Sequence, residues 1–421
     1  MSGNNEKSFI RGYSMLLHSL LMWMFFIATA STGLNILIPG FAAKNALDAT
    51  GLLSVNTIAA LIAVFVSIGI NRVAMAYGVK LVTIISLFVG GIIGMLGLGV
   101  VSSVAGFTVC AIAAQCACNG YSNSVTNNLI TNWFPRTRGR MLGITTCGVP
   151  LAVLLVIPQL SKLMAQPGGF DKVVFAMGAT LTVVGVISIF WMKNKPEDCG
   201  LYPDNKPFTE EEKKSRLLAR ASAVEWSWGS ILKNRTAWLI IVAFGLFYIA
   251  CTGFSAQMVP YLIEFGYTQP EAVGIMGRTA FFGLAGSILS GVIDSRFGTK
   301  ISCVIYAVLT TVGFLVLFIS HDRAFILACV FIQATTMGAV ANLIPSIIMQ
   351  CFGRDSFISV NRIIFPGIFL LRSFCYAMVA WGVKNLGGYI NTYAAFGIMC
   401  LAATAVLLLI NTKKVQEPEG A

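Results

Sequence analysis

Charged side chains are scarce in this chain. Only 11% of its 421 residues are Asp, Glu, Lys or Arg, whereas 57% are hydrophobic. A soluble domain carries about 25% charged residues, so a water-facing surface cannot be built from this composition, and a soluble globular protein is excluded. A spanning helix needs about 20 apolar residues. The length therefore leaves room for about twelve spans and for no extended polar domain.

Signatures of catalysis and of metal binding are also lacking. The sequence has no HExxH motif, no nucleophile elbow and no Cys/His cluster, and it contains only two His. Ten of the eleven Cys lie in or beside apolar segments, and Cys199 alone lies in a polar loop, which indicates small, reduced, buried side chains. We expect no enzyme, no metal and no cofactor. A membrane enzyme would need such a motif, and a non-transporting sensor would normally bring a soluble signalling domain.

Twelve apolar stretches are long enough to cross a bilayer. Each backbone must satisfy its own hydrogen bonds in lipid, so we expect every one to be a helix and the fold class to be an all-α membrane protein. The predicted spans are residues 15–38, 52–71, 80–101, 106–132, 141–163, 173–192, 237–259, 271–293, 301–320, 324–349, 363–383 and 390–410.

The basic residues predict the orientation. With the N-terminus inside, 22 of the 29 Lys and Arg fall on the inner side and six on the outer side. This bias predicts a multi-pass protein of the cytoplasmic (inner) membrane with both termini cytoplasmic. It also explains the net charge of +12 without a nucleic-acid partner. The cluster Arg136, Arg138 and Arg140 is read as an anchor at anionic headgroups, with Arg138 also a candidate gating residue.

One long polar stretch divides the spans six and six. The predicted domains are an N-terminal bundle at 1–192, a cytoplasmic linker at 193–235 with a surface helix at 209–221, and a C-terminal bundle at 236–421. An internal repeat supports this division. Gly78-Val79-Lys80 follows span two and Gly298-Thr299-Lys300 follows span eight. Trp133-Phe134-Pro135-Arg136 follows span four and Cys351-Phe352-Gly353-Arg354 follows span ten.

At these residues the chain resembles the major facilitator superfamily. The segment GVIDSRFGTK (291–300) is similar to the loop that recurs in each half of the family, although Ala74 stands where the first half should have its Asp. The resemblance implies two pseudo-symmetric six-helix bundles with a substrate site between them near the midplane, and alternating access. It further implies a cytoplasmic latch, for which the candidate gating residues are Asp294, Arg296, Gly298 and Arg362.

Two further segments narrow the resemblance. WFPRTRGRMLGI (133–144) and KPEDCGLYPDN (195–205) are similar to the oxalate/formate antiporter-like and monocarboxylate-porter-like branches, close to bacterial bile-acid carriers. This implies a secondary active transporter that moves a small organic anion, a carboxylate, by exchange or symport. The alternative is efflux of hydrophobic or amphipathic compounds such as bile-acid-like molecules or drugs.

Arg372 lies nine residues into span eleven and is the one basic residue near the mid-depth of a predicted span. A charge there costs from about 2.5 kcal/mol upward and marks a functional site by default. No Asp or Glu lies deep in any predicted span, so a substrate carboxylate is the simplest partner. The alternative is a structural Arg held by carbonyls and by side chains such as Tyr376 or Asn342. Arg278, near the outer end of span eight, is either a second anion contact or an interfacial Arg.

Polar side chains inside the spans complete the predicted binding site, because amides in lipid must face the bundle interior. Tyr248 and Thr252 fall together in span seven, and His18 in span one is either a proton relay or a marker of the headgroup region. The predicted partners are the organic anion, the bilayer and a counter-transported anion or proton, for a monomer. The candidate binding residues are Arg372, Arg278, Gln115, Asn119, Tyr248, Gln333, Asn342 and Tyr376.

Overall fold

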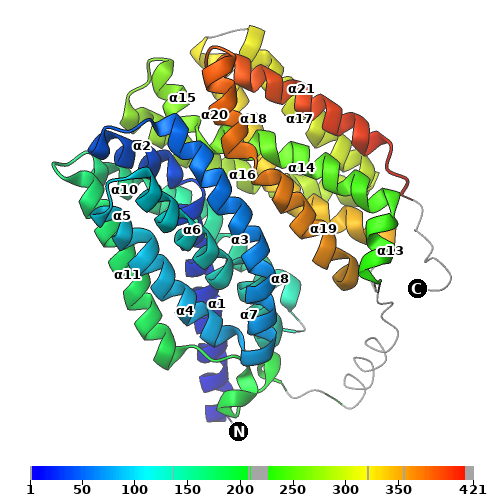
Figure 1. Cartoon of the computed structure of the whole chain (residues 1–421). Coiled ribbons are helices and arrows are strands. Elements are labelled where there is room, and N and C mark those ends of the chain that lie inside the picture. Colours follow the sequence, from blue (N-terminus) through cyan, green and yellow to red (C-terminus); the bar gives the residue numbers. More distant parts are fainter. Residues whose placement is uncertain are drawn as a thin grey trace. The chain divides into compact units, whose positions relative to one another are not determined.

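The computed structural model of the chain is built of helices (Figure 1). It describes residues 2–135, 137–206, 209, 226–319, 322–353 and 356–412, and these contain no strand. The helices are α1 (Ser2–Ala30), α2 (Leu34–Asn45), α3 (Ala49–Tyr77), α4 (Val79–Phe88), η1 (Val89–Leu96), α5 (Gly97–Val100), α6 (Val104–Tyr121), α7 (Asn123–Trp133), α8 (Arg138–Thr146), α9 (Gly148–Leu151), η2 (Ala152–Val156), α10 (Ile157–Met164), α11 (Gly169–Trp191), η3 (Pro196–Cys199), η4 (Pro203–Asn205), α13 (Trp228–Lys233), α14 (Arg235–Ala256), α15 (Met258–Glu264), α16 (Gln269–Phe297), α17 (Thr299–Ile319), α18 (Arg323–Phe352), α19 (Phe357–Arg372), α20 (Cys375–Asn385) and α21 (Tyr389–Leu408).

Twelve helical stretches among the described residues are long and apolar enough to cross a bilayer, which confirms the predicted fold class. They overlap the twelve predicted spans one for one. The stretches are Arg11–Ala30, Ala49–Ala74, Val79–Val100, Val104–Trp133, Met141–Met164, Gly169–Trp191, Arg235–Ala256, Gln269–Phe297, Thr299–Ile319, Arg323–Phe352, Ser359–Asn385 and Tyr389–Leu408.

The first span ends earlier than the apolar run predicts. Helix α1 stops at Ala30 and α2 starts at Leu34. Between them the Gly33 N–H donates to the Ile27 carbonyl at 2.9 Å. A Cβ at Gly33 would lie 1.6 Å from the Ala28 oxygen, so the turn depends on the missing side chain. Hydropathy does not register the break because the residues on both sides are apolar.

Span four is also interrupted, at Ser122, whose backbone is extended (φ −117°, ψ −160°) between α6 and α7. The Ser122 hydroxyl donates to the Cys118 carbonyl at 2.5 Å. The Thr126 hydroxyl donates to the Tyr121 carbonyl at 3.0 Å. The Ser122 backbone N–H also donates to the Cys118 carbonyl, at 3.0 Å. The Thr126 hydroxyl therefore gives the Tyr121 carbonyl a partner at the interruption, as an apolar environment requires.

Contacts divide the chain into two compact units. The first unit comprises Met1–Glu210 and Leu262–Gly277, and the second comprises Glu211–Tyr261 and Arg278–Ala421. The predicted linker, 193–235, is described only at 193–206, 209 and 226–235. The surface helix predicted at 209–221 lies outside the described residues beyond Thr209.

In the first unit, the start of the predicted linker is tied to the bundle. The Trp133 indole N–H donates to the Lys193 carbonyl at 3.2 Å. The Asn194 side-chain oxygen accepts from the Lys80 backbone N–H at 2.8 Å. The Thr137 hydroxyl donates to Asp204 at 2.6 Å. These bonds fold residues 193–204 against the ends of α4, α7 and α8.

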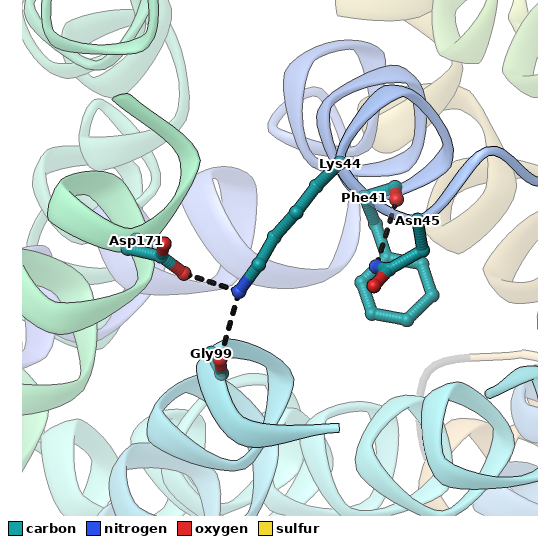
Figure 2. A network of polar contacts seen from close by, with 5 residues as sticks. All are labelled: Phe41, Lys44, Asn45, Gly99 and Asp171. Carbon is teal, nitrogen blue, oxygen red and sulfur yellow. Dashed lines mark hydrogen bonds and ion pairs between the residues drawn. The ribbon is translucent and has the colours of Figure 1, made fainter. Parts of the chain in front are cut away.

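A polar network joins three segments at the end of α2 (Figure 2). The Lys44 ammonium donates to the Gly99 carbonyl at 2.9 Å and to the Asp171 carboxylate at 2.5 Å. Asn45 donates to the Phe41 carbonyl at 3.0 Å. Lys44 therefore connects α2 to α5 and to the first turn of α11.

In the second unit, α14 is the most enclosed span. The buried share of its most apolar 18 residues is 72%, against 28–50% for the other eleven spans. Trp226, nine residues before α14 begins, is 2% exposed. The Trp226 ring meets Phe352 edge-on at 5.4 Å between centroids, and its backbone N–H donates to the Ser359 hydroxyl at 3.4 Å. Trp226 thus anchors the end of the predicted linker to α18 and α19.

Candidate functional site

Arg372 is the last residue of α19, at a break in span eleven. A turn at Ser373 and Phe374 separates α19 from α20. The whole span runs Ser359–Asn385, which places Arg372 thirteen residues from either end. At about 1.5 Å per residue, the side chain starts roughly 20 Å from each end of the span, as the sequence predicts for a charge near mid-depth.

Two glycines allow α14 and α19 to approach closely. A Cβ at Gly245 would lie 2.4 Å from the Leu371 side chain, and a Cβ at Gly367 would lie 2.9 Å from the Ile241 side chain. Small residues let helix backbones pack closely in membranes. The close contact at Gly245 and Leu371 brings the next turn of α14 beside Arg372.

The guanidinium of Arg372 is held by α14 and by its own helix. Its Nε–H donates to the Thr252 hydroxyl oxygen at 3.2 Å. Its Cζ atom lies 5.8 Å from the centroid of the Tyr248 ring and 5.4 Å from that of Phe369. The two rings stack at 6.1 Å with an interplanar angle of 26°. Tyr248 and Thr252 share a face of α14, four residues apart. We call Arg372, Tyr248, Thr252 and Phe369 the arginine box.

No carboxylate completes the arginine box among the residues that the structure describes. Arg372 forms no ion pair with any of them, and its two Nη atoms have no hydrogen-bond partner there. The acidic residues inside the twelve spans are Asp171, Glu271 and Asp294, each within three residues of a span end. Arg372 is half-buried, so its side chain is not fully enclosed by the residues that the structure describes.

The other predicted binding residues of the second unit have no described contact with Arg372. Gln333 is buried and donates to the Thr310 carbonyl at 3.1 Å. Asn342 donates to the Ser287 hydroxyl at 2.8 Å, which ties α18 to α16. Tyr376 is buried in the first turn of α20, and Arg278 is exposed on α16. None of these four has a described contact with Arg372; only Tyr248 among the predicted residues does.

In the first unit, Gln115 and Asn119 tie helices together. Gln115 donates to the Ala30 carbonyl at 3.5 Å, just before the break between α1 and α2. Asn119 donates to the Ala63 carbonyl at 3.4 Å and to the Gln115 carbonyl at 3.2 Å. His18 is buried, and its Nε2 lies 3.0 Å from the Ser188 hydroxyl, so it is enclosed between α1 and α11.

The predicted gating residues have local partners. Asp294 accepts a hydrogen bond from the Thr299 hydroxyl at 2.6 Å, and Gly298 adopts a positive φ of 85°. Arg296 is exposed. Arg362 donates to the Trp226 carbonyl at 2.9 Å and lies 6.0 Å from the Trp228 ring.

Among the described contacts, no ion pair joins Asp294 to Arg362. The side chain of Arg138 lies outside what the structure describes.

Sequence reasoning did not include two members of the arginine box. Its spacing groups Thr252 with Tyr248 but does not mark it as a binding residue, because its role depends on a contact across 120 residues. Phe369 had only one signal, its position three residues before Arg372, which places it on the same helix face. Within the described residues, no group of His, Cys, Asp or Glu could hold a metal ion, and the eleven cysteines are free thiols.

Comparison with solved structures finds the same fold at low sequence identity. A bacterial homologue of the human lysosomal transporter Spinster, in an inward-facing and occupied conformation, gives a TM-score of 0.70 at 12% identity, covering 94% of this chain and 96% of that one. The xylose transporter XylE from E. coli gives 0.72 at 12% identity, covering 97% of both chains. A POT family transporter in complex with 5-aminolevulinic acid gives 0.69 at 14%, covering 95% and 96%. These likenesses concern the fold alone.

Comparison with curated protein sequences gives no match. The sequence pattern of the Major Facilitator Superfamily, in contrast, matches residues 20–371, which is most of the chain and includes spans from both units. Together with the twelve apolar helices, this match identifies the chain as a multi-pass membrane transporter, not an enzyme, and as a member of the Major Facilitator Superfamily.

Proposed function

We propose that this transporter carries a small organic anion by alternating access and that Arg372 binds its carboxylate. One observation carries the proposal: a half-buried guanidinium in the middle of a span whose Nη atoms have no partner among the described residues. A charge at that depth costs from about 2.5 kcal/mol upward. A bound carboxylate offsets this cost by a charge-assisted, bidentate hydrogen bond.

The proposed substrate class and mode of transport rest on the sequence. The segments at 133–144 and 195–205 resemble the oxalate/formate antiporter-like and monocarboxylate-porter-like branches. A carboxylate relay for protons would need an Asp or Glu deep in a span, and the described spans carry acids only near their ends. We therefore propose exchange against a second anion, or flux along the anion's own gradient, over proton symport.

The proposed membrane and orientation follow from the distribution of the basic residues. Their 22-to-6 distribution favours a cytoplasmic (inner) membrane with both termini inside. The six-helix division at 193–235 remains our proposed domain boundary, and we propose a monomer as the working unit.

Efflux of amphipathic compounds is the second candidate function, and one observation favours it. The surroundings of Arg372 on α19 are aromatic: Phe369 stacks on Tyr248, and Phe365 lies 5.8 Å from Phe369 between ring centroids. Rings of this size bury large apolar areas. An acid with a bulky apolar body, bile-acid-like in shape, fits both candidate functions.

A ligand-binding screen on purified protein tests the anion site. The panel is acetate, oxalate, benzoate and cholate, each paired with its neutral amide, and the readout is the shift in melting temperature. We expect at least one carboxylate to raise the melting temperature of the wild type while its amide does not. Arg372→Ala should lose that response.

The matched control is Arg323→Ala, at the start of α18 and away from the arginine box. An Arg372→Ala variant that keeps the wild-type response would remove the anion site. A response to neutral amides alone would favour the efflux of uncharged compounds.

A further inference from the structure

The hydroxyl of Thr252 takes up one specific donor of Arg372. A guanidinium has five N–H donors, one on Nε and two on each Nη. The Nε–H is engaged by Thr252 at 3.2 Å. A carboxylate can bind a guanidinium through two parallel bonds, either side-on through Nε and one Nη or end-on through both Nη atoms. With Nε occupied, the end-on edge is the bidentate face that remains.

We infer that Thr252 is a positioning residue that presents the end-on edge of Arg372 to a single substrate carboxylate. This inference rests on the proposed function. The Tyr248 and Phe369 rings assist, because both lie within cation–π distance of the Arg372 Cζ atom. Together the three side chains fix a guanidinium that would otherwise rotate about a long, flexible stem.

Thr252 differs from five of the six other buried threonines of this unit. Thr310, Thr311, Thr336, Thr392 and Thr404 each donate their hydroxyl to the carbonyl four residues earlier, at 2.8 to 3.0 Å, and Thr299 donates to the Asp294 carboxylate. No such bond is described for Thr252, which is 4% exposed. Its hydroxyl oxygen is directed to Arg372 instead. Because rotation about χ1 of Thr is restricted, the Thr252 hydroxyl oxygen that accepts this hydrogen bond is held in a fixed position.

The same geometry points to a monocarboxylate with an apolar body. The box contains one cation, and its other described neighbours are the rings of Tyr248 and Phe369, with Phe365 next to Phe369. Arg278, the second predicted anion contact, has no described contact with Arg372. A second carboxylate on the substrate would find no second cation among the described contacts of the box, and a desolvated, unpaired charge is costly.

Three variants test the positioning. Thr252→Val removes the hydroxyl but keeps the shape, Thr252→Ser keeps the hydroxyl, and Thr311→Val is the control, since the Thr311 hydroxyl bonds only its own helix at Ala307. The first readout needs no ligand: hydrogen exchange of the Arg372 Nε–H, followed by nuclear magnetic resonance on protein with ¹⁵N-labelled Arg. The resonance is assigned by its loss in Arg372→Lys.

We expect Thr252→Val to accelerate that exchange at least tenfold, and Thr252→Ser and Thr311→Val to leave it within about threefold of wild type. The second readout is the Kd for benzoate and for isophthalate, which adds a second carboxylate to the same ring. Thr252→Val should weaken benzoate binding about tenfold, Thr252→Ser should restore it, and wild type should bind isophthalate more weakly than benzoate.

Each part can fail separately. Unchanged Nε–H exchange in Thr252→Val overturns the positioning role, whether or not any anion binds, and so does wild-type benzoate affinity in Thr252→Val. Isophthalate binding as tight as benzoate binding overturns the monocarboxylate class. If wild type binds neither acid, the proposed monocarboxylate class is wrong. The screen of carboxylates against their amides then decides whether Arg372 binds an anion. The exchange measurement still decides the role of Thr252.

Discussion

The ammonium group of Lys300 donates a hydrogen bond to the carbonyl oxygen of Leu408 at 2.8 Å, and a second one to Ile410 at the same distance. Lys80, at the equivalent place in the first half, donates to the Ile189 carbonyl at 2.6 Å. In both units the final Lys of the repeated loop therefore caps the C-terminal end of that unit's last span. Lys side chains at such ends satisfy free carbonyls and interact well with the helix dipole.

Removing either ammonium should lower stability. Lys300→Met keeps most of the stem but leaves two carbonyls unpaired, whereas Lys80→Met leaves one. We expect the melting temperature to fall by roughly 2–4 °C in Lys300→Met and by less in Lys80→Met. A fluorogenic maleimide can report unfolding, because eight of the eleven cysteines are buried. Lys384→Met, at an exposed position, is the control, and an equal loss in all three variants would refute the capping role.

The glycines that precede these lysines make a second matched pair. Gly78 and Gly298 have φ values of 94° and 85°, which favour Gly over any residue with a side chain. A Cβ at Gly78 would also lie 2.5 Å from the Asn194 side chain, whereas a Cβ at Gly298 would meet nothing within 4 Å. We expect Gly298→Ala to cost about 1–2 kcal/mol of stability and Gly78→Ala to cost more.

Thermal melts of the purified variants would decide this order. Gly291→Ala is the control from the same loop, because Gly291 is helical and a Cβ there would also meet nothing within 4 Å. A Gly78 variant no less stable than the Gly298 variant would show that the contact with Asn194 does not matter.

Proton coupling gives a third prediction. His18 is enclosed between α1 and α11, 3.0 Å from the Ser188 hydroxyl, and the described spans hold acids only near their ends. We expect a carboxylate substrate, at a pH where it is fully ionised, to accumulate in proteoliposomes by exchange and not in response to an imposed pH gradient. Uptake by wild type and His18→Gln, with and without the gradient, measures this. Strong pH-driven accumulation that persists in His18→Gln would rule out the exchange mechanism.

The orientation gives a fourth prediction. Gln166 is exposed in the turn between α10 and α11, on the predicted outer side, and Asn205 lies on the predicted inner side. A cysteine placed at 166 should react with an impermeant thiol reagent added to intact cells, and one placed at 205 should not. Cys199, in the same inner loop, is replaced by Ser in both variants. Labelling at 205 in intact cells would reverse the proposed topology.

The spans could be predicted because lipid imposes one rule on every helix: about 20 apolar residues in a row. The interruptions inside them could not. Gly33 and Ser122 end helices within apolar runs, and what stabilises each interruption is local hydrogen bonding, such as the bond from Ser122 to the Cys118 carbonyl. Hydropathy reports the cost of transfer to lipid and carries no information about such bonds.

The candidate site likewise contains residues that the sequence predicts and residues that it does not. Arg372 could be predicted because a charge inside an apolar run is visible in the sequence alone. Thr252 could not, because its role follows from the close approach of α14 and α19, which Gly245 permits. Gln115 and Gln333 are polar residues in spans, as is Tyr248, yet each of these two amides donates to a carbonyl of a neighbouring helix. Polarity in a span indicates an inward-facing residue but does not separate binding from helix packing.

The turn at Ser373 and Phe374 divides span eleven into two shorter helices, α19 and α20. Arg372 is the last residue of α19, directly before this turn. The Ser373 hydroxyl donates to the Phe369 carbonyl at 2.9 Å. The turn is therefore hydrogen-bonded to α19 through Phe369, whose ring also lies beside the Arg372 guanidinium. An anion bound by Arg372 would therefore lie beside this turn, where the two helices of span eleven meet.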